Sequence, residues 1–98
     1  MTRCVVLRHD GVRECVEWPQ CQVAARLGGA VTFVGVVGDA VALVGLADAS
    51  EQPVNACLPP AVLFEPPARG DVIAVAMDEV GEEVDVDVDA LVRVLDNA

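Results

Sequence analysis

The side chains best suited to nucleophilic or metal chemistry in this 98-residue sequence are four cysteines and one histidine. The cysteines are Cys4, Cys15, Cys21 and Cys57, and the histidine is His9. No Cys-x-x-Cys pair occurs, and a single histidine does not complete a zinc site of the usual spacing. We therefore expect free thiols that pack as small hydrophobic side chains and no metal. A metal site or a catalytic thiolate at Cys21 or Cys57 is the alternative.

No residue pattern predicts a reaction. Ser50 is the only serine, no nucleophile–base–acid set can be assembled around His9, and no glycine-rich loop has P-loop or dinucleotide-binding spacing. The sequence therefore predicts a protein that is not an enzyme and uses no cofactor.

The strongest chemical signal is negative charge near the C-terminus. The chain has a net charge of −10, and residues 71–98 hold nine carboxylates and one arginine. From Glu83 to Asp89, valines alternate with carboxylates, which puts the two kinds of side chain on opposite faces of a strand. This segment is either a solvated edge strand or a docking face for a basic protein partner. In the second case Glu83, Asp85 and Asp87 are the candidate contacts.

Other partners find less support in the sequence. Net negative charge makes nucleic acid an unlikely partner, because binding it requires the neutralisation of phosphates. A calcium loop would need a glycine turn and a closing glutamate, which the acidic run lacks.

A small-ligand site is the alternative function. Asn55 lies in a proline-bounded loop, where its amide either contacts a ligand or a partner protein or satisfies the loop backbone. Arg26 belongs to a possible basic patch with Arg3, Arg8 and Arg13, which either binds phosphate or pairs with Glu14 and Glu17. A pocket between the sheet and the Asn55 loop would use Asn55 and Arg26 to bind a nucleotide-type ligand.

The elements that must position these residues begin with a hairpin. Residues 4–7 and 12–18 are predicted strands, and Asp10-Gly11 suits a two-residue loop. That loop would make Val5 face Val16 and Arg3 face Trp18. A short helix over residues 20–27 follows, beginning after Pro19, with Cys21, Ala24 and Ala25 inward and Gly28-Gly29 as its stop.

Two apolar strands, 30–37 and 40–46, are joined at Gly38-Asp39, and their hydrophobicity places them at the centre of the sheet. Residues 47–70 form a proline-rich loop with a possible short helix at 60–64. A strand at 71–77, a turn at 78–81, a strand at 83–86 and a helix capped by Asp87 or Asp89 complete the chain. Its apolar face would hold Val88, Leu91, Val92 and Leu95.

The predicted order is therefore β-β-α-β-β-loop-β-β-α. We expect residues 1–98 to form one small α+β domain with a mixed or antiparallel sheet, an N-terminal hairpin, one short central helix and a C-terminal helix.

Three stretches resemble a known family. They are Val23-Ala-Ala-Arg-Leu-Gly-Gly-Ala-Val-Thr-Phe-Val34, Pro53-Val-Asn-Ala-Cys-Leu-Pro-Pro60, and the run from Gly70 to Asp85. In this order they are similar to the phage and large-virus family called domain of unknown function 3846. Leu27 stands where valine is usual in that family, and the family has no established activity. The resemblance implies a viral or mobile-element accessory protein.

The sequence contains no apolar run long enough to cross a membrane and no signal peptide. We therefore expect a cytoplasmic protein, inside the host cell if it is viral, that has no membrane partner. Whether it is a monomer or a homo-oligomer stays open.

Overall fold

The computed structural model describes residues 1–38 and 40–97. The elements follow in the order β1 (Thr2–Leu7), β2 (Arg13–Trp18), α1 (Val23–Leu27), β3 (Val31–Val37), β4 (Val41–Leu46), a 3₁₀ turn η1 (Pro60–Val62), β5 (Val72–Met77), β6 (Glu83–Val84) and α2 (Val88–Asn97). This order and the antiparallel sheet confirm the predicted α+β class. Of the predicted turn at Gly38-Asp39, Asp39 lies outside the described residues.

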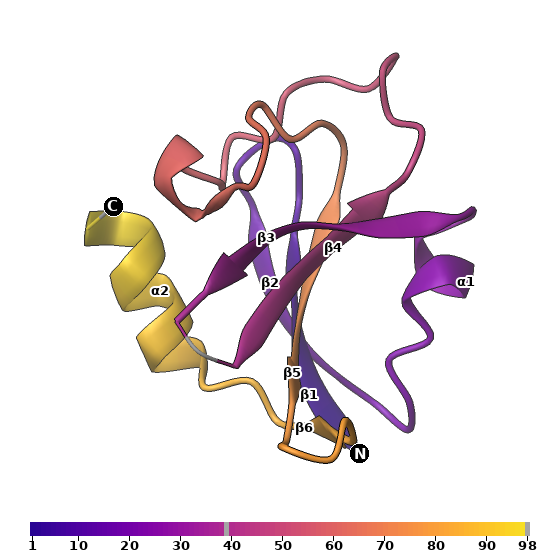
Figure 1. Cartoon of the computed structure of the whole chain (residues 1–98), viewed down its shortest axis with the longest axis vertical. Coiled ribbons are helices and arrows are strands. Elements are labelled where there is room, and N and C mark those ends of the chain that lie inside the picture. Colours follow the sequence, from indigo (N-terminus) through magenta and orange to yellow (C-terminus); the bar gives the residue numbers. More distant parts are fainter. Residues whose placement is uncertain (39, 98) are drawn as a thin grey trace.

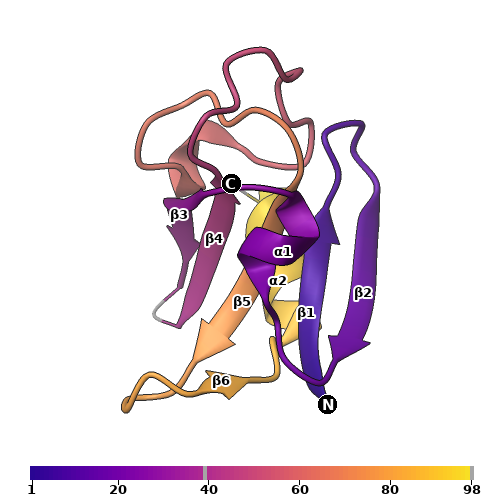
Figure 2. The same cartoon turned by 90° about the vertical axis from the view of Figure 1, so that its right-hand side faces the viewer.

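The strands form one antiparallel sheet in the order β2-β1-β5-β4-β3, and β6 pairs with the end of β5 (Figure 2). The prediction that residues 30–37 lie at the sheet centre is wrong, because β3 is an edge strand. The central strand is β5, whose residues from Val72 to Ala76 are all buried. The long loop before β5 carries the chain back across the sheet, and β5 then inserts between β1 of the first hairpin and β4 of the second.

Both faces of the sheet are covered, which explains why its inner strands are apolar without alternation. Figure 1 shows α2 on one side of the strands and α1 on the other. The α2 side also receives the loop residues Cys57, Leu58 and Val62. The α1 side packs Cys21 and the partly buried Leu27 against β1, β4 and β5.

The first hairpin has a different register from the one predicted. Val5 pairs with Cys15 and Arg3 pairs with Glu17, one residue away from the expected partners. The loop has three residues, His9 to Gly11, closed by a 2.8 Å hydrogen bond from Arg8 N–H to the Val12 carbonyl. Gly11 has φ +99°, as the left-handed last residue of a three-residue hairpin loop requires. The Asp-Gly pair thus marks the turn correctly but does not determine its length.

Helix α1 is shorter than predicted, and Ala24 and Ala25 are exposed rather than inward. Cys21 is buried as expected, but it lies before the helix in the turn that follows β2. Gln22 adopts a left-handed conformation with φ 42°, so the helix starts only at Val23. Gly28, with φ 85°, ends the helix as predicted.

The last segment leaves the sheet early. Strand β6 has only two residues, because Val86 N–H then bonds to the Arg3 carbonyl at 3.0 Å instead of continuing along β5. The predicted strand at 83–86 is therefore half as long as expected. Helix α2 has the predicted inner face, with Leu91 and Leu95 buried.

Candidate functional site

The predicted acidic docking residues are exposed, but each one also holds the backbone of the chain. Glu83 Oε2 accepts a hydrogen bond from Cys21 N–H at 3.0 Å, and Asp85 Oδ1 accepts one from Arg3 N–H at 2.8 Å. Asp87 Oδ1 accepts one from Ala90 N–H at 3.1 Å, which makes Asp87 the N-cap of α2. These carboxylates therefore attach the C-terminal segment to the start of β1 and to the turn before α1.

Asp78 has a similar local role in the turn between β5 and β6. Its Oδ1 accepts hydrogen bonds from Val80 N–H at 3.0 Å and Glu82 N–H at 2.9 Å. Within the described residues, the side chains of Glu79, Glu82 and Asp89 make no hydrogen bond or ion pair. These three are the acidic groups of this end that are free to meet a partner.

Asn55 is a buried structural residue, with 3% of its surface exposed. Its Nδ2 donates to the Leu7 carbonyl at 2.9 Å and to the Gly70 carbonyl at 2.8 Å. Its Oδ1 accepts from Cys57 N–H at 2.8 Å. Both amide hydrogens are thus used inside the chain, and the interpretation that Asn55 satisfies loop backbone is the one that the geometry supports.

Three of the four N-terminal arginines pair with carboxylates instead of forming a basic patch. Arg3 pairs with Glu17 at 3.3 Å, and Arg8 pairs with Glu14 at 3.0 Å. Arg13 reaches across to Asp96 of α2 at 2.8 Å. Pairing with neighbouring carboxylates, the alternative considered for this set, is confirmed for Arg3 and Arg8.

Arg26 differs from these arginines. Its guanidinium lies over the Trp18 ring, 3.7 Å from the ring centroid, and its Nε donates to the Cys21 carbonyl at 3.1 Å. Within the described residues it has no carboxylate partner. The structure therefore does not join Arg26 and Asn55 in one site as predicted: Arg26 is exposed, and the Asn55 amide is turned into the protein.

The cysteines are all free thiols, as predicted. Cys4, Cys21 and Cys57 are buried as expected, but the prediction that the cysteines pack as small hydrophobic side chains is wrong for Cys15, which is exposed. Burial raises the pKa of Cys4, Cys21 and Cys57, so their thiols stay protonated and poorly nucleophilic near neutral pH. Among the described residues, no group of three or more His, Cys, Asp or Glu side chains is arranged to hold a metal ion.

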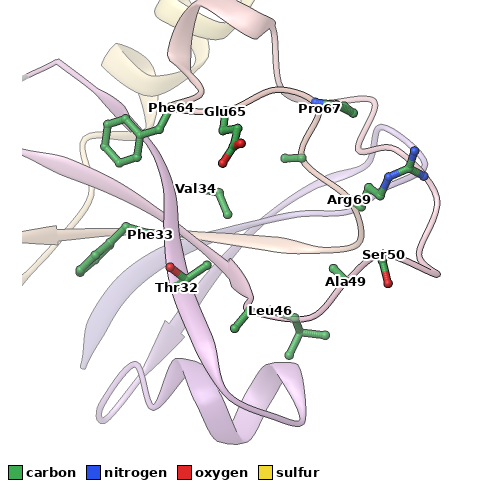
Figure 3. Close-up of a pocket in the computed structure, with 12 residues that line it drawn as sticks. Thr32, Phe33, Val34, Leu46, Ala49, Ser50, Phe64, Glu65, Pro67 and Arg69 are labelled. Carbon is green, nitrogen blue, oxygen red and sulfur yellow. The ribbon is translucent and has the colours of Figure 1, made fainter.

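A further cavity contains none of the site residues predicted from the sequence. It is an open cleft of about 320 Å³ between the first half of β3, the turn after β4 and the proline-rich loop. We call it the Phe cleft, because Phe33 and Phe64 line one end and are 59% and 65% exposed. Figure 3 shows the Glu65 carboxylate directed into the cleft above Val34. The sequence signal was an aromatic residue in an uncharged strand, and it was missed because β3 was expected to be buried.

The edge of β3 beside this cleft has free backbone groups. Ala47 N–H donates to the Ala30 carbonyl at 2.9 Å, so Ala30 and Ala47 are a hydrogen-bonded pair of the β3–β4 ladder. Hydrogen-bonded and non-hydrogen-bonded pairs alternate along an antiparallel ladder. In that alternation Thr32 faces Gly45 as a hydrogen-bonded pair, so Val31 and Phe33 direct their N–H and C=O groups away from β4.

The protein itself pairs with the next part of this edge. Phe64 N–H donates to the Val34 carbonyl at 3.0 Å, and Leu63 forms an antiparallel bridge with Gly35. This short intrachain contact covers the middle of β3 and leaves the Val31–Phe33 edge uncovered within the described part of the chain. The outer edge of β3 is therefore competent for antiparallel pairing.

Comparison with protein-family models, curated proteins and solved structures finds no match to this chain. Within residues 1–38 and 40–97, no helix is both long and apolar enough to cross a membrane.

Proposed function

We propose that this protein is a non-enzymatic binding module that takes an extended, basic segment of a partner protein at the Phe cleft and the adjoining edge of β3. The observation that carries the proposal is the exposed Phe33 on an uncharged edge strand of a chain with net charge −10. The acidic C-terminal end is a second candidate contact for the same partner, supported by the free carboxylates of Glu79, Glu82 and Asp89.

The two edges of the sheet contrast in a way that favours this function. Edge strand β2 has the sequence Arg-Glu-Cys-Val-Glu-Trp, and its charges block pairing with another strand. Edge strand β3 has the sequence Val-Thr-Phe-Val-Gly-Val-Val and no charge. An uncharged edge with an exposed aromatic residue is the kind of surface to which an extended peptide adds as a further strand. The Leu63–Phe64 segment already pairs in this manner.

Charge selects the kind of partner. Glu65 lines the cleft and, within the described residues, makes no hydrogen bond or ion pair. Glu51 is next in sequence to Ser50, which lines the cleft, and Arg69 is the one cation of the lining. A lysine or arginine next to an apolar residue would pair with Glu65 while the apolar side chain contacts Phe33. A second copy of this chain would bring a further net charge of −10, which opposes self-association.

The biological setting of the proposal rests on the sequence. The resemblance to the phage and large-virus family would make the protein a viral or mobile-element accessory factor. Four free thiols suit a reducing compartment, which supports the cytoplasm, or the host-cell interior for a viral protein, as its place of action.

The test uses a library of random peptides displayed on yeast as the probe. We expect enrichment of peptides in which lysine or arginine lies next to alternating apolar residues. Phe33→Lys should weaken the binding of those peptides at least about tenfold, because it replaces an aromatic anchor by a charge that repels the basic segment. Methylating alternate backbone nitrogens of the peptide should have a similar effect, because it removes the donors that pair with β3.

The matched control is Val94→Lys, which makes the same charge change at a residue of α2 that is 36% exposed. It should leave peptide binding unchanged, and circular dichroism should show both variants folded. Enriched peptides that bind Phe33→Lys as tightly as wild type, or no enrichment, would contradict the proposal. So would a wild-type dimer that Phe33→Lys dissociates, because the occupant of the edge would then be a second copy.

A further inference from the structure

A second hollow lies on the α1 face of the sheet and shares Leu46 with the lining of the Phe cleft. It consists of two adjoining cavities of about 80 Å³ and 210 Å³, and both are lined by Arg26, Leu27 and Asp71. Trp18 and Arg8 line the smaller cavity, and His9, Gln52 and Gly70 line the larger. We call these two cavities together the Arg26 groove.

Arginine is concentrated in the lining of this groove. Its lining has two guanidinium groups, from Arg8 and Arg26, and a single carboxylate, from Asp71. The chain as a whole has sixteen carboxylates and six arginines. Arg8 is paired with Glu14 at 3.0 Å and with Asp71 at 3.1 Å, so Arg26 is the cation of this lining whose charge is available to an anionic ligand.

The Asp71 carboxylate does not cancel the charge of Arg26, because other groups already use it. Its Oδ1 accepts hydrogen bonds from His9 N–H at 3.0 Å and is 3.2 Å from His9 Nδ1, and its Oδ2 pairs with Arg8 at 3.1 Å. Burial opposes its ionisation, but these contacts together lower the pKa of Asp71 below the ordinary value. Asp71 is therefore an ionised, internally paired group that holds Arg8 and His9 in the wall.

Arg26 is held ready for a ligand. The Trp18 ring covers one face of its guanidinium, and Nε is engaged by the Cys21 carbonyl. The two terminal nitrogens have no acceptor within the described residues. Stacking and the Nε hydrogen bond reduce the entropy that an arginine side chain loses on binding, so the free fork is preorganised for a pair of oxygen atoms.

Asn55 holds together two chain segments that line the Arg26 groove. Its amide ties the Gly70 carbonyl to that of Leu7, the last residue of β1. Gly70 lines the larger cavity and Leu7 precedes Arg8, so one buried side chain fixes both sides of this corner. Asn55 is thus a positioning residue for the Arg26 groove and does not contact its ligand.

From this geometry we infer that the Arg26 groove binds the phosphate group of a small phosphate-bearing molecule, with the Arg26 terminal nitrogens as the donors and the His9 ring as a neighbouring wall contact. A phosphate monoester is the favoured class, because its oxygens match the guanidinium fork and its charge pairs with that of Arg26. This inference is independent of the proposed peptide-binding function, since none of the groove's donors lines the Phe cleft.

The experiment is a titration of the ¹⁵N-labelled protein, followed by NMR, with inorganic phosphate, adenosine 5′-monophosphate and adenosine as separate probes. We expect saturable shifts of the Trp18 indole and Arg26 Nε signals with both phosphate compounds at millimolar concentration, and none with adenosine. Tighter binding of the nucleotide would show that the ligand extends beyond the phosphate. Equal binding would show that the phosphate alone is recognised, and both results support the inference.

Matched variants separate a specific site from general charge. Arg26→Gln should weaken phosphate binding about ten- to hundredfold, because a charge-assisted hydrogen-bond pair is lost. His9→Gln should weaken it less. Arg93→Gln makes the same charge change on the exposed side of α2 and should have no effect. Thermal unfolding checks that each variant is folded, and peptide binding at the Phe cleft should be unchanged in all three.

Two results would overturn the inference. One is the absence of saturable shifts with either phosphate compound. The other is phosphate binding that Arg26→Gln leaves as tight as in wild type, or that Arg93→Gln weakens equally. In the latter case the shifts would report a general charge effect rather than the groove.

Discussion

Single polar residues in this protein act mainly by satisfying backbone groups of distant segments. Asn55 is the clearest case, because one buried amide makes three hydrogen bonds that connect the end of β1, Gly70 two residues before β5, and the loop itself. The sequence showed that Asn55 was unusual, since it is a polar amide between prolines. It did not show which groups the amide would meet, because Leu7 and Gly70 are distant in the chain and meet only in the fold.

This role makes a residue-scale prediction. Asn55→Asp keeps the shape of the side chain but places an oxygen against the Leu7 and Gly70 carbonyls, so two acceptors lose their donor. We expect the free energy of unfolding to fall by about 2–4 kcal/mol, measured by urea titration. Asn97→Asp, on an exposed amide that bonds only to the Arg93 carbonyl, is the control and should cost less than about 0.5 kcal/mol. Equal stability of wild type and Asn55→Asp would refute the structural role.

At the scale of elements, the sequence predicted whether a segment is a helix or a strand better than it predicted which strands pair and in which register. Turn residues and apolar runs located β1 to β5 and α2 to within a few residues, because these signals are local. The position of β3 could not be predicted from its composition, since an uncharged apolar strand fits either the centre or an exposed binding edge. The hairpin register was also out of reach, because Asp10-Gly11 suits both a two- and a three-residue loop.

The start of α2 is a choice between two aspartates that the sequence left open. The structure selects Asp87, whose carboxylate bonds to Ala90 N–H, while Asp89 is already inside the first turn. Asp87→Ala should therefore cost about 1 kcal/mol of stability, and Asp89→Ala only a few tenths through the helix dipole. Urea unfolding of the two variants measures the difference. A larger loss for Asp89→Ala would show that the helix begins later than described.

On the scale of the whole molecule, the acidic residues beside the Phe cleft, Glu51 and Glu65, and the acidic turn between β5 and β6 lie toward opposite ends of the sheet. Figures 1 and 2 show the proline-rich loop at one end and the β5–β6 turn, with β6, at the other. The longest dimension of the molecule is 32 Å, whereas charges in physiological salt act over about 8 Å. Charge counted along the chain favoured the acidic C-terminal end as the docking face, because such a count does not show how far the charge lies from an apolar surface.

This separation leads to a test that distinguishes the two surfaces by equal changes of charge. One variant neutralises the rim of the Phe cleft, with Glu51→Gln and Glu65→Gln. The other neutralises the distal turn, with Glu79→Gln and Glu82→Gln. The four side chains are exposed and make no hydrogen bond or ion pair within the described residues, so both variants should keep the fold and melt at or slightly above the wild-type temperature as self-repulsion falls.

Stopped-flow measurement of association with the basic peptides selected at the Phe cleft then shows which pair of carboxylates attracts the partner. We expect the rim variant to associate about three- to tenfold more slowly at low salt and to show a flatter salt dependence, because long-range attraction mainly raises the association rate. The distal variant should associate less than about twofold more slowly, because screening weakens charges beyond a Debye length. The opposite order, with the distal pair dominant, would make the acidic C-terminal end the docking face. The β3 edge would then have no role in binding the partner.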